Sequence, residues 1–187
     1  MAHGRGTTRR LGTSRRRTNQ RAFETLEQRI ALHGDAVDEF DVLVFSKTEG
    51  FRHGSIQTGV ETIEQIGFAN GFHVVATEDA ETFSSDGLAE FEAVVFLNTT
   101  GDVLNDTQQD AFERYIESGG GYVGIHAAAD TEYGWSWYGE LVGAYFRTHP
   151  AQQVATVHFE DRVHPSTEGL PERWTVCLLY TSDAADE

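Results

Sequence analysis

The sequence has almost no lysine or cysteine, and it has no long hydrophobic run. Lys47 is the one lysine and Cys177 the one cysteine among 187 residues. A single cysteine excludes an intrachain disulfide and any metal site built from several cysteines. No apolar run approaches the roughly 18 to 20 residues that a membrane-spanning helix needs, so we expect no membrane partner.

The charge is divided unevenly along the chain. Eight arginines lie within the first 29 residues, whereas residues 34–176 carry 25 acidic residues against five arginines and Lys47, a net charge of about -19. This acidic part would repel nucleic acid, which is therefore not an expected partner of the domain. An acidic, lysine-poor surface is typical of halophilic proteins. An ordinary acidic cytoplasmic protein is the alternative.

Residues 1–40 combine clustered arginine with low hydrophobicity, which predicts a basic arm that is disordered or loosely helical. Ser14-Arg15-Arg16-Arg17 is similar to a twin-arginine export motif. The residues that follow, Thr18-Asn19-Gln20-Arg21, are polar where a signal peptide is apolar. We therefore expect a cytoplasmic protein.

From residue 41 onwards, apolar β-prone runs alternate with helical patterns. Helices are expected to begin after Ser55 and Asn105, each an N-cap, and to end before Gly71 and Gly119. The alternation predicts one doubly wound α/β domain with a mostly parallel sheet over residues 41–176. The expected strands are Asp41–Ser46, Phe72–Thr77, Ala93–Leu97 and Tyr122–Ile125, with a further edge strand within Gln153–Glu160.

The stretch Gly119–Asp130 contains three glycines, a short apolar strand and then a histidine among alanines. The strand is apolar enough to be buried on both faces, and it would place His126 at its carboxyl end. Ligands of open α/β sheets bind at this edge, so His126 is a candidate functional residue. The alternative is a histidine hydrogen-bonded into a loop.

Polar residues also follow the other strands, and a parallel sheet would bring them to the same edge. Two uses of these residues stay open. The first is a divalent metal site, for zinc for example, with His53, His126 and His149 as ligands. The second is general acid–base chemistry on a polyol. In that case the candidate catalytic residues are His126, His53 and Asp130, and the candidate substrate-binding residues are Arg52, Asn98, Thr99, Trp135 and His164.

Each candidate also has a structural interpretation, and for Trp135 it is simple core packing. The chain has no Gly-x-x-x-x-Gly-Lys phosphate loop and no Gly-x-Ser-x-Gly nucleophile elbow. It also has no His-Glu-x-x-His motif, so the metal interpretation lacks a short ligand motif. No cofactor is therefore identified from the sequence.

Several motifs together resemble the ThuA-like, or trehalose-utilisation, domain family. They are Phe45-Ser46-Lys47-Thr48 with Gly50-Phe51-Arg52-His53, Asn98-Thr99-Thr100-Gly101-Asp102, Gly119–Asp130, His149-Pro150, and His164-Pro165-Ser166-Thr167. The resemblance implies a flavodoxin-like sheet of the class I glutamine-amidotransferase-like type. Amidotransferases of this type carry a cysteine nucleophile where this sequence has His126-Ala127, so glutaminase chemistry is not expected.

The resemblance also implies a protein of sugar catabolism that acts on trehalose-like or oxidised (keto) glycosides, as a hydrolase or lyase. The expected partner is thus a small-molecule glycoside, and self-association into a homo-oligomer stays open. The alternative function is a noncatalytic carbohydrate-binding or regulatory module on the same fold.

The last eleven residues, 177–187, match the translation of a transposon adapter used in sequencing libraries. We expect them to be a non-native tail and the domain to be truncated near Val176. The Asp-Glu-Trp-Tyr motif of the family, which would follow the proline-bearing loop, is missing from this chain. A tail of this kind predicts that Leu178, Leu179 and Tyr180 have no place in the core.

Overall fold

The computed structural model describes residues 40–149, 151 and 153–177, and the predicted basic arm lies almost wholly outside this part. Four strands form a parallel sheet in the order β2-β1-β3-β4. This order confirms the predicted doubly wound α/β fold of the flavodoxin-like type. The strands are β1 (Phe40–Phe45), β2 (Phe72–Thr77), β3 (Ala93–Leu97) and β4 (Gly121–Ile125).

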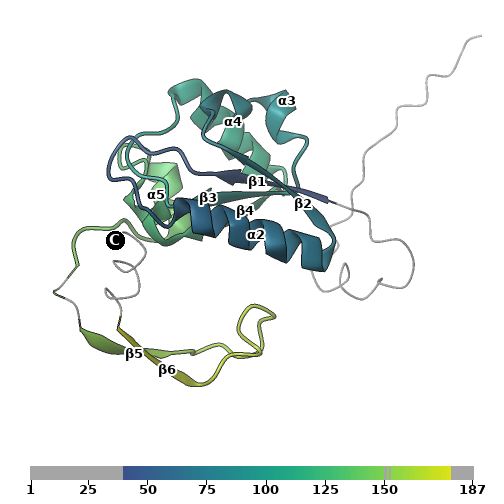
Figure 1. The fold of residues 1–187 in the computed structure, drawn as a ribbon. Coiled ribbons are helices and arrows are strands. Elements are labelled where there is room, and N and C mark those ends of the chain that lie inside the picture. Colours follow the sequence, from purple (N-terminus) through teal and green to yellow (C-terminus); the bar gives the residue numbers. More distant parts are fainter. Residues whose placement is uncertain (1–39, 150, 152, 178–187) are drawn as a thin grey trace, which may run out of the picture. The chain divides into compact units, whose positions relative to one another are not determined.

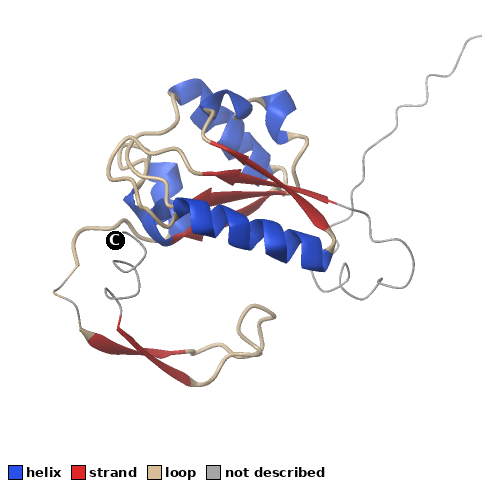
Figure 2. Ribbon diagram, in the orientation of Figure 1, coloured by secondary structure: helices blue, strands red, loops and turns tan. Residues whose placement is uncertain are grey.

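Helices cover both faces of this sheet (Figures 1 and 2). On one face, α2 (Ile56–Asn70) packs against a cluster that includes Val44 and Leu97. The other face carries the larger core, which is mostly aromatic because Phe45, Phe96 and Phe112 are fully buried there. The remaining helices are η1 (Ala80–Thr82), α3 (Ser85–Leu88), α4 (Asp106–Glu117), η2 (His126–Asp130) and α5 (Ser136–Val142).

The helix ends follow the sequence signals with one exception. Gly71 closes α2 in a left-handed conformation, and Asn105 and Gln108 form the predicted capping box of α4. Ser55 stands at the N-cap position of α2, but its side chain accepts no capping hydrogen bond. Its hydroxyl instead accepts a hydrogen bond from the Asn98 amide, so the capping role predicted for Ser55 is wrong.

Two strand predictions need correction. β4 is not buried on both faces, because it lies at the edge of the described sheet and Val123 is 48% exposed. The segment expected to be an edge strand of the main sheet is β5 (Val154–His158), which pairs antiparallel with β6 (Arg173–Cys177) in a separate two-stranded sheet. The suspected tail thus begins at the last residue of β6, and residues 178–187, with Leu178, Leu179 and Tyr180, lie outside the described residues.

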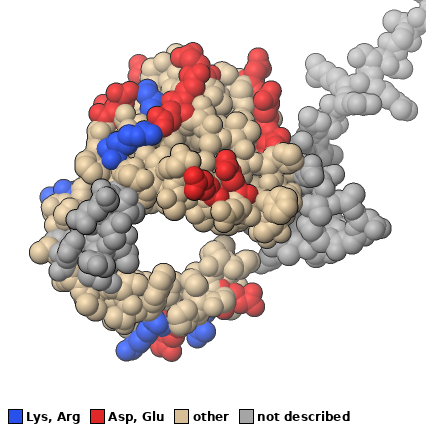
Figure 3. Space-filling model, viewed as in Figure 1, with Lys and Arg blue, Asp and Glu red and all other residues tan. Residues whose placement is uncertain are grey.

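Acidic side chains outnumber basic ones on the visible surface of the described residues (Figure 3). Such a surface attracts cations and repels anions. An adaptation to high salt stays a prediction. Within residues 40–149, 151 and 153–177, none of the helices combines the length and the apolar character that crossing a bilayer requires.

Candidate functional site at the carboxyl edge of the sheet

Two histidines from different strand ends meet at the carboxyl edge of the sheet. His53 comes from the loop after β1, and His126 begins η2 directly after β4. Their ring centroids are 4.6 Å apart and the rings meet edge to face at 72°. Phe51, which is 62% exposed, packs on His53, and their ring centroids are 4.8 Å apart. The fold therefore brings together two of the three predicted histidines.

The chain turns sharply where it presents His126. This residue has a φ of 52°, in the left-handed region that non-glycine residues seldom adopt. A side chain at Gly124 would not fit, because its Cβ would lie 2.8 Å from the Tyr122 hydroxyl. The turn then buries Ala127 and Ala128 and leaves His126 exposed. Strained residues of this kind cluster at functional sites. His126 lies directly after β4, at the carboxyl end of the strand, as the sequence predicted.

Asn98 lies at the end of β3 and also has a φ of 52°. It is 3% exposed, and its Nδ2 donates a hydrogen bond to Ser55 Oγ over 2.9 Å. Its Oδ1 is buried and accepts no hydrogen bond from the residues that the structure describes. A buried acceptor without a donor is costly. Because this oxygen is closed to solvent, it is not a surface that a ligand hydroxyl meets in this structure.

Asp130 ends η2 and is tied to the chain that follows it. The hydroxyl of Tyr133 donates to Asp130 Oδ1 at 2.5 Å and is also 2.7 Å from the Phe146 carbonyl. Desolvation, together with the hydrogen bond to Asp130, raises the pKa of Tyr133 to about 12. The phenol is protonated at neutral pH and serves as the donor that holds the Asp130 carboxylate.

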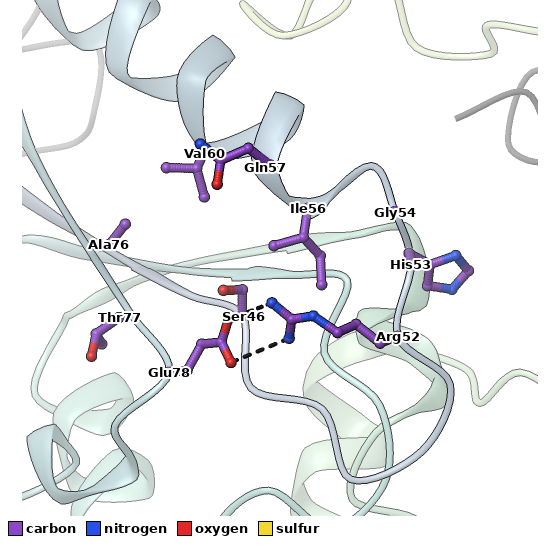
Figure 4. Close-up of a pocket in the computed structure, with 10 residues that line it drawn as sticks. All are labelled: Ser46, Arg52, His53, Gly54, Ile56, Gln57, Val60, Ala76, Thr77 and Glu78. Carbon is purple, nitrogen blue, oxygen red and sulfur yellow. Dashed lines mark hydrogen bonds and ion pairs between the residues drawn. The ribbon is translucent and has the colours of Figure 1, made fainter. Parts of the chain in front are cut away.

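Arg52 forms a bidentate ion pair with Glu78, which follows β2 (Figure 4). The two nitrogen–oxygen distances are 2.6 and 3.2 Å. The pair stands at a hollow of about 450 Å³ lined by the ends of β1 and β2 and the start of α2. His53 also borders this hollow, but its imidazole projects away from the ion pair (Figure 4).

Two predicted substrate-binding residues are part of the framework. Thr99 is fully buried, and its hydroxyl is 2.9 Å from that of Thr131, which is buried as well. Trp135 packs into the aromatic core, stacked on Trp137 at 5.1 Å and on Tyr138 at 5.8 Å. The hydroxyl of Thr99 is inaccessible and the indole of Trp135 is engaged in packing, so their predicted contacts with substrate are not supported by this geometry.

The other two predicted residues lie further along the chain. His164 stands in the loop between β5 and β6, where its Nδ1 accepts a hydrogen bond from the Ser166 backbone. His149 follows α5, and its ring centroid is 6.1 Å from that of Phe146. These contacts are local, and they link neither residue to the pair of His53 and His126.

The predicted divalent metal has no set of ligands among the described residues at this edge. A tetrahedral zinc site needs at least three protein ligands that converge. No group of three or more histidine, cysteine, aspartate or glutamate side chains that could hold a metal ion occurs in the part of the chain that the structure describes. The three-histidine set of His53, His126 and His149 does not fit a metal here, and no chemical step is derived through one.

Sequence reasoning missed Glu132, a buried carboxylate close to the elbow. It is 1% exposed, has a φ of 57°, and accepts hydrogen bonds from the backbone of Val103 and Leu104 and from the Gln109 amide. Burial raises the pKa of Glu132, and these hydrogen bonds oppose the shift. In a chain with 30 acidic residues, nothing in the sequence distinguishes this one. Glu78 was missed for the same reason.

A doubly wound sheet with polar residues gathered at its carboxyl edge defines an α/β domain of the flavodoxin-like class. The family model of trehalose utilisation, ThuA, matches residues 41–179. The chain therefore belongs to the ThuA family, as its motifs predicted.

A solved structure of a ThuA-like protein from Bacteroides uniformis is similar to this chain, with a TM-score of 0.65 and 24% sequence identity. The match covers 78% of this chain and 62% of that one. The chain thus spans about 62% of the length of this protein, and the likeness shows the shared fold. No curated protein matches the sequence.

Proposed function

We propose that the chain acts on a trehalose-like or keto glycoside at the carboxyl edge of the sheet, with His53 and His126 as general acid and base. Membership of the trehalose-utilisation family supports the substrate class. The observation that carries the proposal is the meeting of the two imidazole rings at 4.6 Å, from loops after two different strands.

Two imidazoles suit the cleavage of a glycosidic bond. One neutral ring takes a proton from water or from the sugar carbon, and one protonated ring gives a proton to the leaving oxygen. Histidine is the side chain whose ordinary titration lies closest to neutral pH.

The neighbouring groups would position the substrate. The guanidinium of Arg52 would donate to a sugar hydroxyl, whereas the buried Asn98 amide holds the Ser55 hydroxyl and does not itself meet the substrate. We propose that Asp130 holds the turn that carries His126 in place, because Asp130 ends η2 and His126 begins it.

The experiment is a turnover assay with trehalose and keto-trehalose, using the wild type, His126→Asn and a control, His73→Gln. Asparagine tolerates a positive φ, so His126→Asn removes the imidazole and keeps the turn. His73 is exposed on β2, away from the carboxyl edge. We expect His126→Asn to lose at least about 100-fold in turnover while still binding sugar. Sugar binding by the wild type without any turnover would instead identify a carbohydrate-binding module.

A further inference from the structure

The hollow beside Arg52 has the size and lining of a sugar subsite. Its volume of about 450 Å³ lies within the range of small-molecule pockets, about 300–1,000 Å³. Ile56 and Val60 give it an apolar wall, while Ser46, Gln57 and Thr77 offer neutral polar groups. This mixture suits a ring with apolar C–H faces and a rim of hydroxyls.

The charged groups of the lining are Arg52 and Glu78, together with the titratable His53. The side chains of Arg52 and Glu78 are 51% and 49% exposed. An ion pair as exposed as this contributes little to stability. Its bidentate geometry is therefore poorly explained by a role in folding.

The pair does control the charge that a ligand meets. Glu78 neutralises the guanidinium and would repel a phosphate or carboxylate that approached it. A neutral hydroxyl meets no such barrier, because it can donate to the carboxylate and accept from the guanidinium at once. The acidic surface of the chain also repels anionic ligands.

We propose that this hollow binds an uncharged, hydroxyl-bearing sugar ring and that Glu78, by pairing with Arg52, makes it selective against phosphorylated or carboxylated sugars. This inference rests on the proposed function, since His53 borders the hollow and also meets His126. Glu78 is thus a specificity-determining residue, and an isolated Arg52 would favour the opposite, anionic ligands.

The test measures binding of trehalose, trehalose 6-phosphate and inorganic phosphate by calorimetry, with wild type, Glu78→Gln and Glu90→Gln. The control Glu90→Gln removes the same charge from an exposed residue after α3, on the other face of the sheet. We expect the wild type to bind trehalose and to reject both phosphates. Glu78→Gln should bind trehalose about tenfold or more weakly and should gain binding of both phosphates, at an unchanged melting temperature.

Three results would overturn the inference. They are a wild type that prefers trehalose 6-phosphate, a wild type that binds none of the probes, and a Glu78→Gln variant with the affinities of Glu90→Gln. Different results would contradict the proposed function. Selective trehalose binding without turnover would contradict only the proposed function, whereas turnover with a KM unchanged by Glu78→Gln would contradict only this inference.

Discussion

The carboxylate of Glu132 accepts a hydrogen bond from the backbone N–H of Leu104 over 2.7 Å. The same oxygen accepts a second bond from the N–H of Val103 over 2.8 Å. These contacts connect the segment after η2 to the segment between β3 and α4. Because His126 begins η2 after β4 and Asn98 directly follows β3, the buried carboxylate links the ends of these two strands.

Removal of this carboxylate is expected to destabilise the protein strongly. Glu132→Ala leaves two buried N–H groups without acceptors, at an expected cost of about 2–4 kcal/mol in the free energy of unfolding. Glu132→Gly should lose about 1 kcal/mol less, because glycine tolerates the φ of 57°. Urea denaturation of both variants measures these costs. A Glu132→Ala variant as stable as the wild type would contradict the role given to the carboxylate.

Thr99→Val tests whether this residue belongs to the framework or to the substrate site. The hydroxyl of Thr99 is buried against that of Thr131, which is also 3.3 Å from the Ala127 carbonyl. We expect Thr99→Val to lower the free energy of unfolding by about 1 kcal/mol and to leave KM for a glycoside unchanged. A rise in KM without a loss of stability would show that Thr99 contacts the substrate.

Tyr122 in β4 and its neighbour Tyr138 predict that the protein loses stability at alkaline pH. Tyr138 donates its hydroxyl proton to the Ala128 carbonyl, so Tyr122 donates to the Tyr138 oxygen over 2.8 Å. Burial raises the pKa of Tyr122 from 10.0 to about 12, although the hydrogen bond with Tyr138 opposes this. The unfolded chain therefore releases the proton at lower pH than the folded chain does.

The stabilisation from this shift is complete below pH 10 and is lost as the pH rises from 10 to about 12. Thermal unfolding followed by circular dichroism between these pH values measures the loss. Tyr122→Phe removes the titrating group and should lose less stability over the same interval, from a starting value about 1 kcal/mol lower. If both proteins had the same pH dependence, Tyr122 would not be the group responsible.

The strands of the main sheet could be predicted from the sequence because their signals are local. Each of the first four strands is a short apolar run, and Gly71 and Asn105 mark helix ends through their own backbone and side-chain chemistry. The pairing of β5 with β6 was not predictable in this way. Arg173–Cys177 is a short segment that ends at the start of the suspected tail and has no helix or turn signal of its own, so no partner for β5 was expected there.

The meeting of His53 and His126 was predictable for the same reason. His126 and His53 follow apolar strands, so the parallel sheet dictates that both reach one edge. Their partners depend on side-chain directions that a sequence does not encode locally. The contact of Asn98 with Ser55, the ion pair of Arg52 with Glu78, and the burial of Glu132 appear only once the loops are placed.

The most direct test of the account is a double-mutant cycle on the two histidines, with His53→Gln, His126→Asn and the double variant compared for kcat/KM on one glycoside. Groups that act as a unit give strongly non-additive losses. We predict that the double variant loses about as much activity as the more damaging single variant. Losses that multiply in the double variant would mean that the imidazoles act independently, and an active double variant would contradict the central claim that this pair performs the reaction.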